Sequence, residues 1–243
     1  MIYYGCISDL CVPWQFRFPD TEHYLRKYMT GPEASGPIDF TGKPVAVTEQ
    51  EFSDWAQAGN AIDAFAEFCL LCEQSSEYML SHDRCIFHAA ALSYSGRAWL
   101  IAAESGVGKS TLCNCLLENY PEEITVINGD KPALQYIEDD GILVHPSPWN
   151  GKEGMHGAGK ALLSGIFLLK RGNDNAIVPT KKAEAATRIY RSIFQAFQDE
   201  EIMKAAGRMT EHILKVVPVW SLTSKDVPDT AQLVYRTMKE ALS

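Results

Sequence analysis

Apolar positions along the chain follow both the spacing of helices and the spacing of strands. Residues 61–80 repeat apolar side chains at helical intervals, which predicts a helix. Nearly continuous apolar runs at 97–103 and 162–170 are typical of central strands that are covered on both faces. This mixture predicts an α/β fold built on a mixed β-sheet.

The same patterns predict most of the remaining elements. Strands are expected at 84–94, 124–129 and 217–224, a hairpin at 132–147 around Asp139-Asp140-Gly141, and helices at 109–119, 183–198, 200–216 and 229–242. Residues 1–48 show strand-like runs at 2–12 and 43–47, with loops predicted at 17–24 and 29–37. We therefore expect a β-rich portion with one helix over 1–80, of no assigned role, and an α/β core over 81–243.

The stretch AAESGVGKST, residues 102–111, links a predicted strand to a predicted helix. Backbone N–H groups in such a glycine-containing loop form an anion-binding nest, and the helix N-terminus adds partial positive charge. The side chain of Lys109 is suited to bind the β- and γ-phosphates, and the Ser110 hydroxyl to bind Mg²⁺. The pattern G-x-x-x-x-G-K-[ST] fails only at Ala103. We interpret the stretch as a phosphate-binding loop; the alternative is an ordinary strand-to-helix turn.

A carboxylate follows at the end of the next predicted strand. Asp130 closes the segment VINGD, where an acid can hold Mg²⁺ directly or through water. The alternative is that Asp130 merely opens a turn before Lys131-Pro132. Ser110 and Asp130 are thus the predicted metal ligands.

Two segments carry a resemblance to a known family. FHAAALSYSGRAWLIAAESGVGKST followed by INGD resembles the catalytic core of HPr kinase/phosphorylase and, more distantly, phosphoenolpyruvate carboxykinase. INGDKPAL and PWNGKEG resemble the small HPr kinase-related proteins of peptide-modification clusters, such as lasso-peptide precursor kinases. The resemblance implies a mixed-sheet P-loop kinase core with ATP and Mg²⁺ as cofactors, and the preference for ATP over GTP rests on it alone.

The resemblance also implies roles for individual residues. His88 matches a histidine near the active site, Glu104 an acid within the loop, and Asp130 the second of two paired aspartates. The residues implied to bind the nucleotide are Glu104, Ser105, Gly106, Val107, Gly108, Lys109, Ser110 and Thr111.

This chain departs from the family at the paired acids. Gly129 stands where the first aspartate is expected. Either Asp130 serves as both base and metal ligand, or Glu104 or Glu153 supplies the base. The C-terminal signature of HPr kinase is also absent, which counts against phosphorylase activity and against HPr as the substrate.

Further candidates have structural alternatives. His88 lies on an apolar strand, so it is either a site residue that orients or accepts a proton, or a core histidine. In the glycine-rich stretch 149–160, Lys152 is a candidate to neutralise phosphoryl charge and Glu153 a candidate base or metal ligand. The alternative there is a surface loop. Arg188 and Arg191 are suited either to bind phosphate or to form a solvated helix face.

Charge and composition limit the partners. The net charge of -9 argues against binding to nucleic acid or anionic membranes. No apolar run is long enough for a membrane span, and the first residues lack a signal-peptide pattern, so we expect a cytoplasmic protein. The seven cysteines, including the Cys69–Cys72 pair, suit buried thiols in a reducing compartment. The sequence leaves homo-oligomer formation open.

Together these features predict an ATP- and Mg²⁺-dependent kinase that phosphorylates a hydroxyl, plausibly of serine, in a peptide, a protein or a small molecule. One alternative is a non-catalytic nucleotide sensor or scaffold, which the missing acid permits. A carboxykinase is the other, but it would need further metal ligands and a longer chain.

Overall fold

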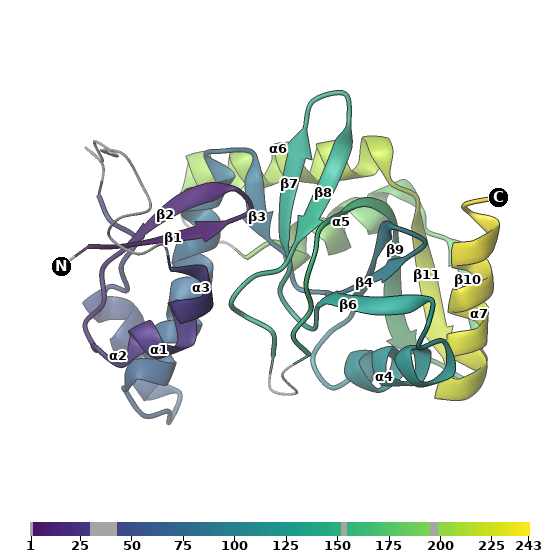
Figure 1. Ribbon diagram of the computed structural model, residues 1–243, viewed down its shortest axis with the longest axis horizontal. Coiled ribbons are helices and arrows are strands. Elements are labelled where there is room, and N and C mark those ends of the chain that lie inside the picture. The colour runs from purple at the N-terminus through teal and green to yellow at the C-terminus, as the bar shows by residue number, and fades with distance from the viewer. Residues whose placement is uncertain (1, 30–42, 152–154, 195–198) are drawn as a thin grey trace.

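The computed structural model describes residues 2–29, 43–151, 155–194 and 199–243. Within this part of the chain, nine strands form one mixed sheet, which confirms the α/β prediction (Figure 1). Along the sheet lie β3 (Arg84–Ile86), β7 (Ala133–Ile137), β8 (Gly141–His145), β9 (Ala161–Arg171), β5 (Arg97–Ala102), β4 (Ala90–Tyr94) and β6 (Ile124–Asn128). In addition, β11 (Val219–Ser224) pairs with β9, and β10 (Ala176–Pro179) pairs with β11.

The long strand β9 organises the sheet. It is parallel to β5 and parallel to β11, while its first residues pair antiparallel with β8. The carboxyl ends of β5, β9 and β11 therefore meet at one edge of the sheet, where ligands of open α/β sheets usually bind. The predicted phosphate-binding loop leaves β5 at this edge.

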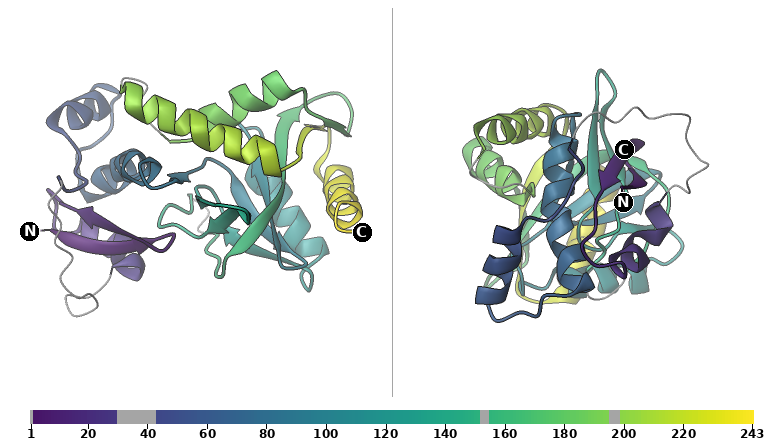
Figure 2. Two further views of the ribbon diagram at one scale, coloured as in Figure 1. Left: turned by 90° about the horizontal axis from the view of Figure 1, so that it is seen from above. Right: turned by 90° about the vertical axis from the view of Figure 1, so that its left-hand side faces the viewer.

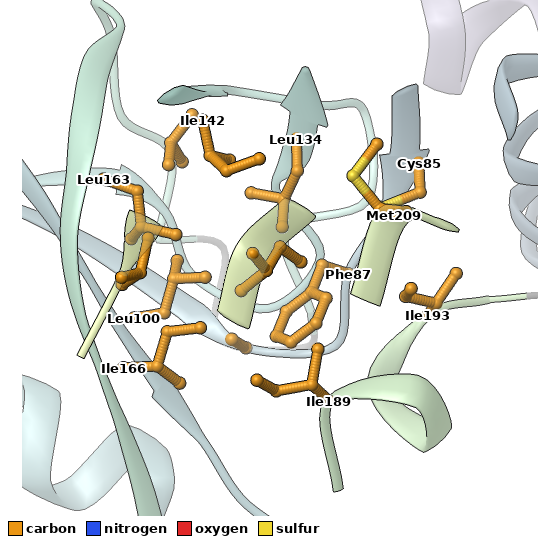
Figure 3. Close-up of a cluster of buried hydrophobic side chains, with 14 of the residues drawn as sticks. Cys85, Phe87, Leu100, Leu134, Ile142, Leu163, Ile166, Ile189, Ile193 and Met209 are labelled. Carbon is orange, nitrogen blue, oxygen red and sulfur yellow. The ribbon is translucent and has the colours of Figure 1, made fainter. Parts of the chain in front are cut away.

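Helices cover both faces of the sheet, as the two fully apolar strands require. On one face, α4 (Lys109–Asn119) and α7 (Val227–Glu240) pack against Ile101 and Phe167; on the other, α5 (Lys182–Ser192) and α6 (Glu200–Val216) pack against Leu100 and Leu168. Neighbouring residues of one strand thus enter opposite cores. Figure 3 shows the second core, where Ile189 and Met209 meet Phe87, Leu100 and Leu134.

The N-terminal portion lies at the end of the molecule opposite to helices α4 and α7 (Figures 1 and 2). The predicted strand run forms a hairpin of β1 (Tyr3–Ile7) and β2 (Leu10–Trp14), and the predicted helix is α3 (Ala64–Leu80). Within 43–47, Val45 makes only an isolated bridge with Trp14. A third buried cluster joins this portion to the sheet through Ile86, Ala133 and Trp149. The division at residue 80 stays a prediction.

Two helices of this portion differ from the sequence prediction: one lies where a loop was expected, and the other was not predicted. Residues 17–24 were expected to form a loop, but α1 (Thr21–Leu25) begins there and continues as the 3-10 helix η1 (Arg26–Tyr28). The cause is tertiary: the buried Glu67 carboxylate accepts the hydroxyl hydrogen of Thr21 at 2.6 Å and the N–H of Phe18 at 3.0 Å. Helix α2 (Glu49–Gln57) was missed, although Thr48 and Glu51 form a capping box at its start.

Several boundaries in the core also differ. The strand predicted at 84–94 is interrupted at 87–89, because the N–H of Ala89 bonds to Asp130 O at 3.0 Å and that of His88 to Ser192 O at 2.7 Å. The helix predicted at 183–198 ends at Ser192, since Ile193 bridges to Phe87. The edge strand β10 was not predicted. No helix among the described residues is long and apolar enough to cross a membrane.

Candidate functional site

The predicted phosphate-binding loop has the expected strand–loop–helix context. Strand β5 ends at Ala102, and α4 begins at Lys109. Gly106 and Gly108 have φ values of 78° and 114°, which favour glycine. Gly108 is also the N-cap of α4, so the loop amides and the first turn of the helix face one region. These donors suit a polyphosphate group.

An arginine that the sequence analysis missed fastens this loop to β9. Arg171, the last residue of β9, donates from Nη2 to the Gly106 carbonyl at 3.1 Å and from Nε to the Val107 carbonyl at 3.2 Å. The sequence signal for this role is a charged residue directly after a long apolar strand. In the structure that strand, β9, runs parallel to β5 and so ends beside the loop. The arginine fixes loop carbonyls and leaves the loop amides for another partner.

Three basic or titratable side chains meet at the carboxylate of Asp130. Lys109 Nζ donates to Asp130 Oδ1, and His88 Nε2 lies 3.4 Å from the same oxygen. Lys131 Nζ lies 2.5 Å from Oδ2. The side chains of Lys109 and Asp130 are only 10% and 19% exposed, so the cluster is largely shielded from water. The structure thus brings together His88, Lys109 and Asp130, which were predicted separately, and adds Lys131.

The surroundings of Asp130 keep it ionised. Burial by itself would raise the pKa of Asp130, but the hydrogen bond with His88 and the positive charges of Lys109 and Lys131 hold this pKa well below its ordinary value. A permanently ionised carboxylate is a competent Mg²⁺ ligand across the physiological pH range.

The turn that carries Asp130 is shaped by a buried asparagine. Asn128 Oδ1 accepts the N–H of Asp130 at 2.9 Å and the N–H of Lys131 at 2.7 Å. Its Nδ2 donates to Asn150 Oδ1 at 2.9 Å and to the Ser147 carbonyl at 3.2 Å. The backbone around Asp130 is therefore fixed by side chains of a distant segment.

Packing explains the glycine in place of the first acid. A Cβ atom at Gly129 would lie 2.7 Å from Met155 Cβ and 3.0 Å from the Asn150 carbonyl oxygen. A carboxylate cannot occupy this position unless Asn150 or Met155 moves. The glycine at position 129 is thus required by the local packing against Asn150 and Met155.

The other predicted residues are placed as follows. Ser110 is half-buried in the first turn of α4, whereas Glu104, Ser105 and Thr111 are exposed. Arg188 donates to the Leu169 carbonyl at 3.3 Å, and Arg191 is exposed. Lys152 and Glu153 lie outside the described residues.

Among residues that are described, no three His, Cys, Asp or Glu side chains gather as a metal cluster. The donor set fits a Mg²⁺–nucleotide, with hard oxygens for the metal and amides for phosphate.

Comparisons with known proteins found similarity among solved structures alone. No protein-family model matches the chain, and no curated protein matches it. Among solved structures, the HPr(Ser) kinase/phosphatase from Coxiella burnetii is similar, at 15% identity and a TM-score of 0.38, over 65% of this chain and 97% of that chain. A likeness at this level says nothing of activity or substrate. The observed fold and loop define an α/β protein whose glycine-containing strand–loop–helix segment suits a phosphate group.

Proposed function

We propose that the chain is an ATP- and Mg²⁺-dependent kinase that transfers the γ-phosphoryl group to a hydroxyl group, with serine in a peptide as the first acceptor to test. One observation carries the proposal: the loop lysine, Lys109, meets the strand-end carboxylate of Asp130 beside His88. The residues that we propose to bind the nucleotide, to hold the metal and to orient the acceptor hydroxyl thereby lie within one shielded site.

The nucleotide would be held by residues 104–111 and the N-terminus of α4. Ser110 and Asp130 would hold Mg²⁺, which when bound supplies positive charge to the β- and γ-phosphates. The loop lysine would contact the same phosphates. Because Arg171 already fixes the loop carbonyls, little reorganisation of the loop is needed for the amides to bind phosphate.

Phosphoryl transfer needs an oriented acceptor more than a strong base. In the proposed reaction the Asp130 carboxylate orients the acceptor hydroxyl by accepting its hydrogen bond, and His88, 3.4 Å from Oδ1, orients that carboxylate. Because Asp130 stays ionised, the hydroxyl proton passes to an oxygen of the transferred phosphoryl group. Glu153 remains an alternative base. Most of the acceleration would come from positioning and charge neutralisation.

The test is phosphate transfer from labelled ATP and Mg²⁺ to serine-containing peptides, to a protein panel and to small hydroxyl compounds. We expect transfer by the wild type and by a Lys204→Met control, whose lysine pairs with Glu200 on the exposed face of helix α6. Lys109→Ala should abolish transfer. A Lys109→Ala protein that still transfers phosphate would contradict the proposed function.

A nucleotide sensor is the second candidate, favoured by Gly129 in place of the first acid and by the packing that excludes a side chain there. A sensor would bind Mg²⁺–ATP in calorimetry without transferring phosphate to any acceptor in the panel. Asp130→Asn separates the two functions. It should stop phosphate transfer if the protein is a kinase, whereas a sensor transfers no phosphate in either form.

A further inference from the structure

A second lysine contacts the carboxylate oxygen of Asp130 that Lys109 does not bind. Lys131 Nζ lies 2.5 Å from Oδ2, whereas Lys109 binds Oδ1. The Lys131 side chain is 24% exposed, and its ammonium lies 5.6 Å from the centre of the Phe194 ring, within cation–π range. Lys131 is thus held beside the site without being sealed from it.

The backbone of Lys131 is fixed on both sides. Its N–H donates to Asn128 Oδ1 at 2.7 Å, and its carbonyl accepts a hydrogen bond from Ser147 Oγ. Asn128 and Ser147 are fully buried. A charged group carried by so constrained a residue is preorganised, which is the condition under which electrostatic stabilisation of a transition state is largest.

The charges of the cluster do not balance. Two ammonium groups, those of Lys109 and Lys131, face the one carboxylate of Asp130. One lysine would suffice to neutralise a single buried acid, and a second adds a net positive charge where the loop directs a polyphosphate. The surplus charge therefore matches an anion that enters the site.

We propose that Lys131 is a catalytic residue, which contacts the γ-phosphoryl oxygens during transfer; this inference rests on the proposed kinase function. The acceptor oxygen forms a bond to the γ-phosphorus as the bond to the bridging oxygen of ADP breaks. The bonding electron pair leaves with ADP, and the hydroxyl proton passes to an oxygen of the transferred phosphoryl group. Lys131 neither gains nor loses a proton, and its ammonium offsets the negative charge on the transferred group.

Calorimetry with the full-length protein tests this role without a known acceptor. The probes are Mg²⁺–ADP, a Mg²⁺-bound non-hydrolysable ATP analogue, and Mg²⁺–ADP with aluminium fluoride, which mimics the phosphoryl group in transfer. Lys131→Met should bind ADP within about twofold of the wild type but lose about 100-fold in affinity for the aluminium fluoride complex, as for removal of one transition-state donor. Lys131→Arg, which keeps the charge, should recover most of that loss.

Lys204→Met is the matched control, because Lys204 also pairs with carboxylates but lies on the exposed face of α6. This variant should bind all three probes like the wild type. Melting temperatures verify folding, and Lys131→Gln, whose amide can still donate to Asp130, replaces Lys131→Met if the latter does not fold. A wild type that binds no probe overturns the proposed function together with the role of Lys131. If the wild type binds all three and Lys131→Met loses equal affinity for each, or none, only the role of Lys131 is overturned.

Discussion

Gly151 offers a direct way to move Asp130 without changing any charge. Its φ is +77°, and a Cβ atom there would lie 2.9 Å from Asp130 Cβ and 3.3 Å from Asp130 Cγ. Ordinary carbon contacts need about 3.5–4.0 Å, so Gly151→Ala should push Asp130 by roughly 0.5–1 Å. Misplacement by about 1 Å can cost about 100-fold in rate, so we expect a loss of about 10- to 100-fold in phosphate transfer.

The matched control is Gly159→Ala. Gly159 has a similar φ of +85°, but a Cβ atom there would meet nothing within 4 Å. Both variants should lose about 1–2 kcal/mol of unfolding free energy from left-handed strain, measured by urea titration. Only Gly151→Ala should also weaken Mg²⁺-dependent ATP binding and phosphate transfer. Equal losses in the two variants, or wild-type transfer by Gly151→Ala, would refute the assigned position of Asp130.

Three further predictions follow from the described contacts. Lys109→Ala should lower the affinity for Mg²⁺–ATP at least about 100-fold in calorimetry, because it removes a charged phosphate ligand. Arg171→Ala should free the loop carbonyls and weaken the affinity for Mg²⁺–ATP about tenfold, whereas the control Lys170→Ala should change this affinity little. Equal losses of affinity in the two variants would mean that Arg171 acts only through its charge. Burial lowers the pKa of His145 to about 4, so the unfolded chain takes up the proton first as pH falls below about 6.5. The free energy of unfolding should therefore drop by up to about 3 kcal/mol between pH 6.5 and 4, a slope that His145→Gln should remove.

Local sequence signals predicted the elements that depend on local physics. The helix at Lys109–Asn119 and the strands at Arg97–Ala102 and Ala161–Arg171 follow from apolar periodicity and from the glycine loop between two of them. The strand–loop–helix geometry of residues 102–111 was predictable because its glycines and lysine lie within one short stretch. The position of Asp130 directly after a strand was also predictable, whereas its role as a metal ligand stays a prediction.

The parts that could not be predicted depend on contacts between distant segments. Arg171 reaches the loop from 64 and 65 positions along the chain, and Asn128 is anchored by Asn150, 22 positions away. The sequence left His88 between core and site, because only the fold shows that the strand breaks there and turns the ring toward Asp130. Helix α1 likewise depends on Glu67, a residue 46 positions beyond Thr21.

The parallel pairing of β5 with β9 also has a consequence for biosynthesis. The loop sequence is complete at Thr111, but its anchor at Arg171 comes from a strand made 60 residues later. Pairings across such separations form late, because loop closure must precede them. A growing chain would thus leave the ribosome with a loose, weakly binding loop, and nucleotide capture in a refolding reaction would report that the sheet has closed around β9.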